Sequence, residues 1–362
     1  ALPDTEAPFV MPVFTLNAFR EQVIEEAGIL PYEFMCSHVD SAHNRTLVMS
    51  TTTRFNLDIM PAGMFTVMIN LKKINDIQRV NKFFETVNKK IPVGGIFIDC
   101  VETNEIKKNR FLSYYWPGLN YFLYFFYYIF RRVIPKLPLL KNFYFFFTNG
   151  YDRSVSMAEA FGRLYSCGFE VIDHTQIGDL LYFVSRKITE PSYDSSPTYG
   201  PLVSLRRVGK NGKIIYVYKL RTMHPYAEYL QAYVHKLNNL DQGGKFKNDF
   251  RVSTAGRFFR KFWLDELPMI FNLLKGDLKL VGVRPLSKHY FSLYTEELQK
   301  KRTRCKPGLI PPYYADMPDT LEEIMQSEDR YLDEYAKHPL KTDWNYFWKA
   351  FRNIVFRKAR SK

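Results

Sequence analysis

The sequence predicts two domains that mix helices and strands, an α/β domain in residues 1–189 and an α+β domain in residues 202–362. Three observations support this prediction. The length of 362 residues is enough to bury about two hydrophobic cores. Strand-like and helix-like segments alternate through residues 64–188, whereas a hairpin pattern opens the second part. The segment between them, EPSYDSSPTYGP in residues 190–201, is rich in Ser, Pro and Tyr, which is typical of a linker.

In the first domain, the regular pattern begins with a strand in GMFTVMIN, residues 63–70. Apolar residues then recur at helical spacing and predict a helix. These residues are Ile74, Ile77, Val80, Phe83, Phe84 and Val87. A second strand is predicted in PVGGIFIDCVET, residues 92–103.

A second helix and two closing strands complete the first domain. Ser156 and Glu159 have the spacing of a capping box, which predicts a helix in SMAEAFGRLYSCG. GFEVID and DLLYFVSRK then have strand patterns. This order resembles the later half of a class I methyltransferase-like Rossmann domain. No Gly-x-Gly-x-x-Gly follows an early strand, and residues 1–63 are short and irregular, so we expect a truncated Rossmann-like domain without methyl transfer.

An aromatic segment is inserted in this domain. Residues 111–130, FLSYYWPGLNYFLYFFYYIF, are uncharged and long enough to enter a bilayer. Basic residues at 107–110 and 131–132 flank them, which disfavours a simple crossing, and Pro117-Gly118 supplies a break. We predict a membrane-associated segment, 111–147, that enters one leaflet or lies along the interface; the alternative is an aromatic core helix. The expected membrane-contacting residues are Tyr121, Phe122, Phe125, Phe126 and Phe130.

The composition indicates anionic partners. The formal net charge is +14 and aromatic residues make up 17% of the chain. This combination fits nucleic acid, phosphorylated substrates or acidic lipid, so it does not choose among them. The four cysteines have no Cys-x-x-Cys spacing and indicate neither zinc nor disulfides. The first residues lack the pattern of a signal peptide, and we expect a reducing cytoplasm.

The second domain opens with a hairpin in VSLRRVGKNGKIIYVYKLRTM, residues 203–223, with Asn211-Gly212 as its turn. Lys219 and Arg221 are expected on one face at the end of the return strand, because strand side chains alternate. Cations in this position suit a phosphate. A solvated strand end is the alternative.

Two adjacent acids, Asp265 and Glu266, precede Pro268 and a predicted helix that stops at Gly276. They have two interpretations. Acids at a helix start can cap free N–H groups. Phosphate also binds at helix N-termini, so one acid could instead attack phosphorus while the other holds a divalent cation.

Four stretches decide between these interpretations by resemblance: RRVGKNGK, YKLRTM, KNDFRVSTAGRFFRKFWLDELPMIFNLLKGDLKLVGVRPLS and KPGLI, which cover most of residues 202–310. In this order they resemble the bacterial sugar transferases that act as monotopic phosphoglycosyl transferases. The resemblance implies that Asp265 is the nucleophile and that Glu266, with Asp265, holds Mg²⁺. The implied substrate-binding residues are Lys219, Arg221, Arg257, Arg260, Arg284 and Pro285.

Three features depart from the family pattern. Val283 replaces the first proline of the family's Pro-Arg-Pro, and KPGLIPPYYADMP replaces its KPGIT-Gly-Trp region. A membrane-entering helix before the hairpin is missing, because residues 185–201 are polar; the aromatic run at 111–130 is the expected substitute.

An apolar stripe in the basic tail predicts an interfacial helix, with packing on the catalytic domain as the alternative. The stripe consists of Trp344, Phe347, Trp348, Phe351, Ile354 and Val355.

The resemblance implies transfer of a sugar-1-phosphate from a UDP-sugar to polyprenyl phosphate through an aspartyl intermediate, with release of UMP. The expected location is the cytoplasmic face of a bacterial inner membrane, without nucleic acid as a partner. A homodimer is left open. Two other functions compete with this prediction, an inactive scaffold of glycan assembly and a basic nucleic-acid-binding protein.

Overall fold

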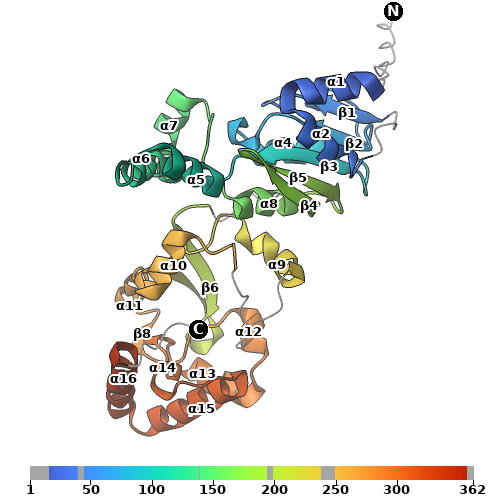
Figure 1. The fold of residues 1–362 in the computed structure, drawn as a ribbon. Coiled ribbons are helices and arrows are strands. Elements are labelled where there is room, and N and C mark those ends of the chain that lie inside the picture. Colours follow the sequence, from blue (N-terminus) through green and yellow to red (C-terminus); the bar gives the residue numbers. More distant parts are fainter. Residues whose placement is uncertain (1–15, 40–44, 138, 194–198, 238–248, 357–362) are drawn as a thin grey trace, which may run out of the picture. The chain divides into compact units, whose positions relative to one another are not determined.

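The computed structural model describes residues 16–39, 45–137, 139–193, 199–237 and 249–356. The chain forms two compact units (Figure 1). The first unit comprises residues 1–199 and 225–230, and the second comprises residues 200–224 and 231–362. Residues 194–198 of the predicted linker and residues 357–362 of the predicted tail lie outside the described residues.

The first unit is built on a mixed five-stranded sheet in the order β1-β2-β3-β5-β4. Its strands are β1 (Thr46–Met49), β2 (Val67–Asn70), β3 (Ile96–Val101), β4 (Phe169–Ile177) and β5 (Leu180–Lys187). The first three strands are parallel, and β5 pairs antiparallel with both β3 and β4. The unit is therefore mixed α/β, as predicted. Its likeness to half of a Rossmann domain stays a prediction.

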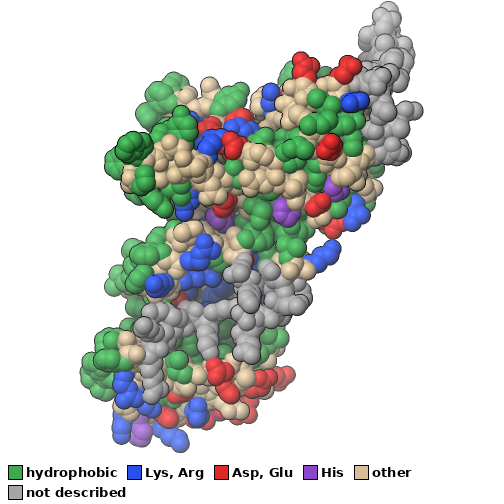
Figure 2. Space-filling model, viewed as in Figure 1, with side chains coloured by type: hydrophobic (Ala, Val, Ile, Leu, Met, Phe, Trp, Pro, Cys, Tyr) green, Lys and Arg blue, Asp and Glu red, His purple; other side chains and the backbone are tan. Residues whose placement is uncertain are grey.

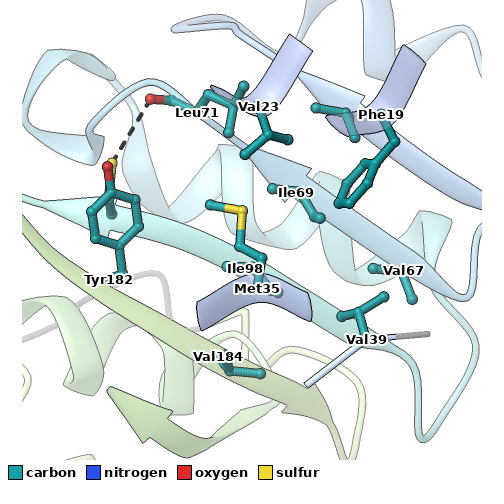
Figure 3. Packing of buried hydrophobic residues seen from close by; sticks show 12 residues of the cluster. Phe19, Val23, Met35, Val39, Val67, Ile69, Leu71, Ile98, Tyr182 and Val184 are labelled. Carbon is teal, nitrogen blue, oxygen red and sulfur yellow. Dashed lines mark hydrogen bonds between the residues drawn. The ribbon is translucent and has the colours of Figure 1, made fainter. Parts of the chain in front are cut away.

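The helices of this unit are α1 (Leu16–Ala27), α2 (Ile29–Cys36), α3 (Phe55–Asp58), α4 (Val80–Lys90), α5 (Asn104–Tyr114), α6 (Leu119–Tyr128), α7 (Lys141–Thr148) and α8 (Met157–Ser166). Side chains of α1 and α2 pack on one face of the sheet, where Val23 and Met35 meet Ile98 (Figure 3). Because strand side chains alternate, Phe97 points to the opposite face. There its ring lies 5.8 Å from that of Phe84 in α4.

Two local predictions for the first unit need correction. The helix predicted from Ile74 begins only at Val80, because residues Ile74–Asp76 form one 3₁₀ turn and Ile77 has extended backbone angles. Ser156 caps α8 as predicted and accepts a hydrogen bond from the N–H of Glu159. The side chain of Glu159 does not return to the cap, however. It pairs with Arg163 at 2.8 Å.

The aromatic segment folds into α5, α6, a π-helical turn (Ile129–Val133) and α7. Among the described residues, no helix is long and apolar enough to cross a membrane. The predicted membrane-contacting residues are all exposed, by 42% to 61%: Tyr121, Phe122, Phe125, Phe126 and Phe130. These five side chains therefore do not form a core helix. They belong to an exposed surface of α6, the π-helical turn and α7, which we call the aromatic surface and which also includes Phe143, Phe146 and Phe147.

The second unit begins with the predicted hairpin of β6 (Leu202–Val208) and β7 (Ile214–Leu220). Asn211 and Gly212 have φ of 56° and 71° at the turn, the left-handed conformation that Asn-Gly favours. A short parallel pair, β8 (Lys279–Val281) and β9 (Gly308–Ile310), lies further along the chain. The two strands approach closely, since a side chain at Gly308 would lie 2.1 Å from the nitrogen of Gly282.

Eight helices are described in the second unit: α9 (Gln231–Leu237), α10 (Thr254–Lys261), α11 (Met269–Lys275), α12 (Lys288–Ser292), α13 (Glu296–Arg304), α14 (Tyr313–Asp316), α15 (Leu321–Lys337) and α16 (Pro339–Phe356). Helix α11 ends at Gly276, as predicted, with φ of 75°. The core around β8 includes Val281, Leu298, Tyr331 and Tyr346.

Helix α16 has two different faces. Tyr346, Ala350 and Asn353 are buried, and Phe347 and Ile354 of the predicted stripe also pack on the unit. The rest of the stripe is exposed: Trp344, Trp348, Phe351 and Val355. One face of α16 therefore packs on the rest of the unit, which was the alternative to an interfacial helix. The opposite face exposes apolar side chains.

Candidate active site

The two acids lie in a tight connection between α10 and α11. Trp263 has φ of 58°, a left-handed conformation that is rare for a bulky residue. One 3₁₀ turn, Leu264–Glu266, follows, and Pro268 leads into α11. The N-termini of this turn and of α11 have no side-chain cap. Neither helix start is therefore capped by the residue at its N-cap position, Trp263 or Pro268.

Glu266 is held by the strand end of the hairpin. Its Oε1 accepts a hydrogen bond from Nζ of Lys219 at 2.7 Å, and both side chains are mostly buried. Lys219 is the second-last residue of β7, so the predicted cationic strand end does meet the acidic pair. A mostly buried, charge-assisted bond of this kind fixes the carboxylate more firmly than an exposed ion pair would.

Asn272 of α11 sets the register between this helix and β7. It is fully buried, and its side-chain amide donates to the carbonyl oxygen of Tyr216 at 2.7 Å and accepts from the N–H of Tyr218 at 3.0 Å. The amide thus pairs with two backbone groups of β7, as a neighbouring strand would. Since Lys219 follows Tyr218 directly, the same contact places the lysine opposite Glu266.

Helix α10 is fixed against the end of the same strand. A side chain at Gly256 would lie 1.9 Å from the carbonyl oxygen of Thr222, so only glycine permits this approach. Ser253 caps the helix, and its backbone N–H also donates to Thr222. Nε of Arg260 then donates to Oγ1 of Thr222 at 3.0 Å. These contacts bring Arg260 close enough for its charge to act on Asp265.

Asp265 differs from Glu266 in its surroundings. Among the described residues it has no ion pair within 4.0 Å. Partial burial and then the negative charge of Glu266 raise the pKa of Asp265. The charges of Lys219 and Arg260 offset part of this increase in its pKa. The site therefore contains one held carboxylate and one half-buried carboxylate whose ionised form is less well stabilised.

Residues 194–357 match the family model of bacterial sugar transferases. This region is a bacterial sugar transferase domain. It is 35% identical over 143 residues to galactosyl transferase CpsE of Streptococcus agalactiae, covering 38% of this chain and 31% of that protein. It is 38% identical over 109 residues to undecaprenyl-phosphate galactose phosphotransferase of Salmonella typhimurium, covering 29% and 23%. The matches thus span less than a third of these two curated relatives.

The sugar transferase domain does not bring every predicted residue to the acidic pair. Arg221 donates from Nε to the carbonyl oxygen of Gly200 at 2.7 Å. Arg257 contacts Thr254 of its own helix at 3.3 Å and is exposed. The described hydrogen bonds of Arg257 are with Val252 and Thr254 and not with the acids.

Arg284 and Pro285 follow β8. Loss of hydration works against the charged form of Arg284, yet Tyr313, Tyr314 and Glu266 together raise its pKa. Its guanidinium carbon lies 5.9 Å from the ring centre of Tyr313. Pro285 is buried. The arginine is thus within electrostatic range of Glu266, as its implied role requires, while the proline is part of the packing.

The donor atoms of the acidic pair suit magnesium. Among the residues that the structure describes, no three His, Cys, Asp or Glu side chains gather as a metal cluster. Mg²⁺ usually takes only one or two protein carboxylates and completes its shell with water and substrate phosphates. Asp265 and Glu266 are adjacent and could supply such a pair. Their chemistry therefore fits the implied ion.

Sequence reasoning missed three residues that shape the site. They are Asn272, Thr222 and Trp263. The spacing of Asn272, six residues after Glu266, was a usable signal, because a polar residue amid the apolar run MIFNLL needs a buried partner.

Proposed function

We propose that this protein transfers a sugar-1-phosphate from a UDP-sugar to polyprenyl phosphate. One observation carries the proposal: Lys219 holds Glu266, while the adjacent Asp265 has no ion pair among the described residues. This difference suits two separate roles, in which Glu266 binds the metal ion and substrate while Asp265 reacts with the phosphorus. The relatives support the reaction class, since one is named as an undecaprenyl-phosphate galactose phosphotransferase.

The proposed reaction has two displacements at one phosphorus. A carboxylate oxygen of Asp265 attacks the phosphorus that carries the sugar, and the bond to the bridging oxygen breaks with its electron pair leaving on UMP. A phosphate oxygen of polyprenyl phosphate then attacks the same phosphorus. The bond to Asp265 breaks and the carboxylate is restored. The product carries a diphosphate between the lipid and the sugar.

The cations around the acids suit the charges of this reaction. Arg260 and Arg284 can offset charge on the bound diphosphate, because arginine pairs well with phosphate oxygens. Lys219 orients Glu266 through the hydrogen bond at 2.7 Å. Bound Mg²⁺, held by Glu266 and Asp265, would supply further neutralisation of the diphosphate.

A lipid acceptor requires contact with a bilayer. The aromatic surface of α6 and α7 and the exposed face of α16 offer Phe, Tyr and Trp side chains, which favour the membrane interface. The net charge of +14 favours an anionic leaflet. We therefore place the protein on the cytoplasmic face of a bacterial inner membrane.

The test is the intact mass of the protein after mixing with UDP-sugars and Mg²⁺ but no lipid acceptor. The wild type should gain a sugar-phosphate that maps to Asp265 and release UMP. Asp265→Asn should gain none, because an amide is a far poorer nucleophile. Glu266→Gln should keep some reaction that added Mg²⁺ partly restores. A protein that neither forms the adduct nor releases UMP with any sugar would be the inactive scaffold.

A further inference from the structure

The first unit contains a pocket of about 430 Å³ beside the aromatic surface. Its lining combines aromatic walls with an ionic floor: Phe111, Tyr115 and Tyr127 with Lys107, Arg110 and Asp152. Figure 2 shows hydrophobic side chains gathered over α6 and α7, with Lys, Arg, Asp and Glu side chains next to them. The proposed sugar-transfer chemistry uses none of these residues.

The ionic floor is built around one buried carboxylate. Glu102 is only 4% exposed and pairs with Lys73 at 3.0 Å, with Lys107 at 3.2 Å and with Arg110 at 2.7 Å. Lys107 and Lys73 also pair with Asp152, at 3.1 and 3.7 Å. Arg131 also lies 3.9 Å from Asp152, so four cations share two carboxylates. Arg110 is the most exposed of the four.

Arg110 is the cation best placed to bind a ligand. Its side chain is 42% exposed, and its other ion pair, at 3.0 Å, is with Asp179, which is 61% exposed. An exposed pair of this kind contributes little, so an incoming anion can replace Asp179. While Nη2 of Arg110 stays paired with Glu102, the remaining N–H groups of the guanidinium can donate hydrogen bonds to two oxygens of one phosphate.

The aromatic side chains of the pocket indicate which kind of molecule the phosphate belongs to. The rings of Phe111 and Tyr127 are tilted against each other, with centres 5.1 Å apart. Tyr114, the last residue of α5, and Trp116 just after it are 79% and 83% exposed. These side chains connect the pocket to the aromatic surface. A phosphate on a lipid could reach the ionic floor while its chains remain with the exposed aromatic residues.

We propose that this pocket binds the phosphate of an anionic phospholipid headgroup, with Arg110 as its main contact. The proposal rests on the membrane contact described above and adds a specific lipid site to it. Such a site would fix the depth and orientation of the first unit on the bilayer, which apolar contact alone leaves free.

The test is co-sedimentation of the full chain with phosphatidylcholine vesicles that contain a rising fraction of phosphatidylglycerol. Arg110→Gln should lower the binding that depends on phosphatidylglycerol by about tenfold, the size of one lost bidentate contact. Arg110→Lys keeps the charge but not the planar pair of N–H donors of the guanidinium, so this variant should also lose most of the phosphatidylglycerol-dependent binding. Arg186→Gln is the matched control, because Arg186 is an exposed arginine of the same unit that pairs with Glu170.

The outcomes separate the pocket from general attraction. Equal losses in Arg110→Gln and Arg186→Gln, or full binding by Arg110→Lys, would show a diffuse electrostatic effect and overturn the proposal. Dependence on Arg110 only in vesicles that carry polyprenyl phosphate would overturn the phospholipid assignment. If the wild type binds no vesicle, membrane contact itself fails and the pocket proposal with it. The adduct test without lipid would then still report separately on sugar transfer.

Discussion

At the scale of single residues, the raised pKa of Asp265 has a consequence for stability. A carboxyl group whose pKa is higher in the folded than in the unfolded chain takes up protons more readily when folded. Stability therefore falls as the pH rises from the unfolded pKa through the raised folded pKa, and the ionised group destabilises the fold at neutral pH. Partial burial is the first cause of this shift, and Glu266 is the second.

We predict that Asp265→Asn abolishes the phosphosugar adduct yet leaves the domain as stable as the wild type at neutral pH, or more stable. The gain should be about 1 kcal/mol or less, because the group is only half buried. Thermal unfolding at pH 7.5 and at the acidic end of the stable range would measure it, with the advantage shrinking as the pH falls. A clear loss of stability would instead favour a helix-start role for Asp265.

The same electrostatics predict how adduct formation depends on pH. Asp265 must be ionised to attack, so the rate should fall as the pH drops through its raised pKa. Lys219 lowers this pKa, so Lys219→Gln should shift the acid limb of the profile to higher pH. Single-turnover rates across pH would measure the shift. Lys275→Gln, the same charge change on exposed Lys275, should leave the acid limb where it is.

At the scale of elements, the site depends on how firmly α11 is joined to β7. We predict that Asn272→Ala slows adduct formation at least tenfold and lowers the free energy of unfolding by roughly 2 kcal/mol, because two backbone groups of β7 lose their buried partner. The loss of register also releases Lys219 from its position opposite Glu266. Adduct rates and denaturant unfolding would be measured together.

The control for this prediction is Asn353, the corresponding amide of α16. It is also buried and donates to two backbone carbonyl groups, those of Tyr314 at 3.0 Å and Ala315 at 2.8 Å. Asn353→Ala should therefore cause a similar loss of stability with a much smaller effect on the adduct. If both variants lose activity in proportion to stability, Asn272 has no special effect on the acids.

The elements also show what the sequence could predict. The hairpin turn at Asn211-Gly212, the stop at Gly276 and the cap at Ser156 were predictable, because each depends on a few neighbouring residues. The start of α4 was not, since the apolar stripe continues through a 3₁₀ turn that periodicity cannot distinguish from a helix. The partners of Asn272 were also not predictable. Tyr216 and Tyr218 lie on a strand far away in the sequence, and only the packed fold brings them to the helix.

At the scale of the whole molecule, each unit has its own exposed apolar surface. The first unit has the aromatic surface of α6 and α7, and the second has the outer face of α16. Large exposed patches of this kind usually mark interaction sites. Under the proposed membrane association, two such contacts on one chain would act together, because the first contact would raise the effective concentration of the second.

We predict that Phe122→Glu with Phe126→Glu weakens binding to phosphatidylcholine vesicles at least tenfold. Two exposed rings that would enter the bilayer are replaced by charges, and burying one such ring contributes about 1.5–3 kcal/mol. Trp344→Glu with Trp348→Glu should weaken binding similarly, and the four changes together should abolish sedimentation. The control is Phe55→Glu with Ile59→Glu, because these residues are 75% and 76% exposed in and beside α3, outside both surfaces. The chain should bind normally with this control pair. If one of the two test pairs has no effect on folded protein, the surface that it lies on does not contact lipid, and the other unit alone holds the enzyme on the bilayer.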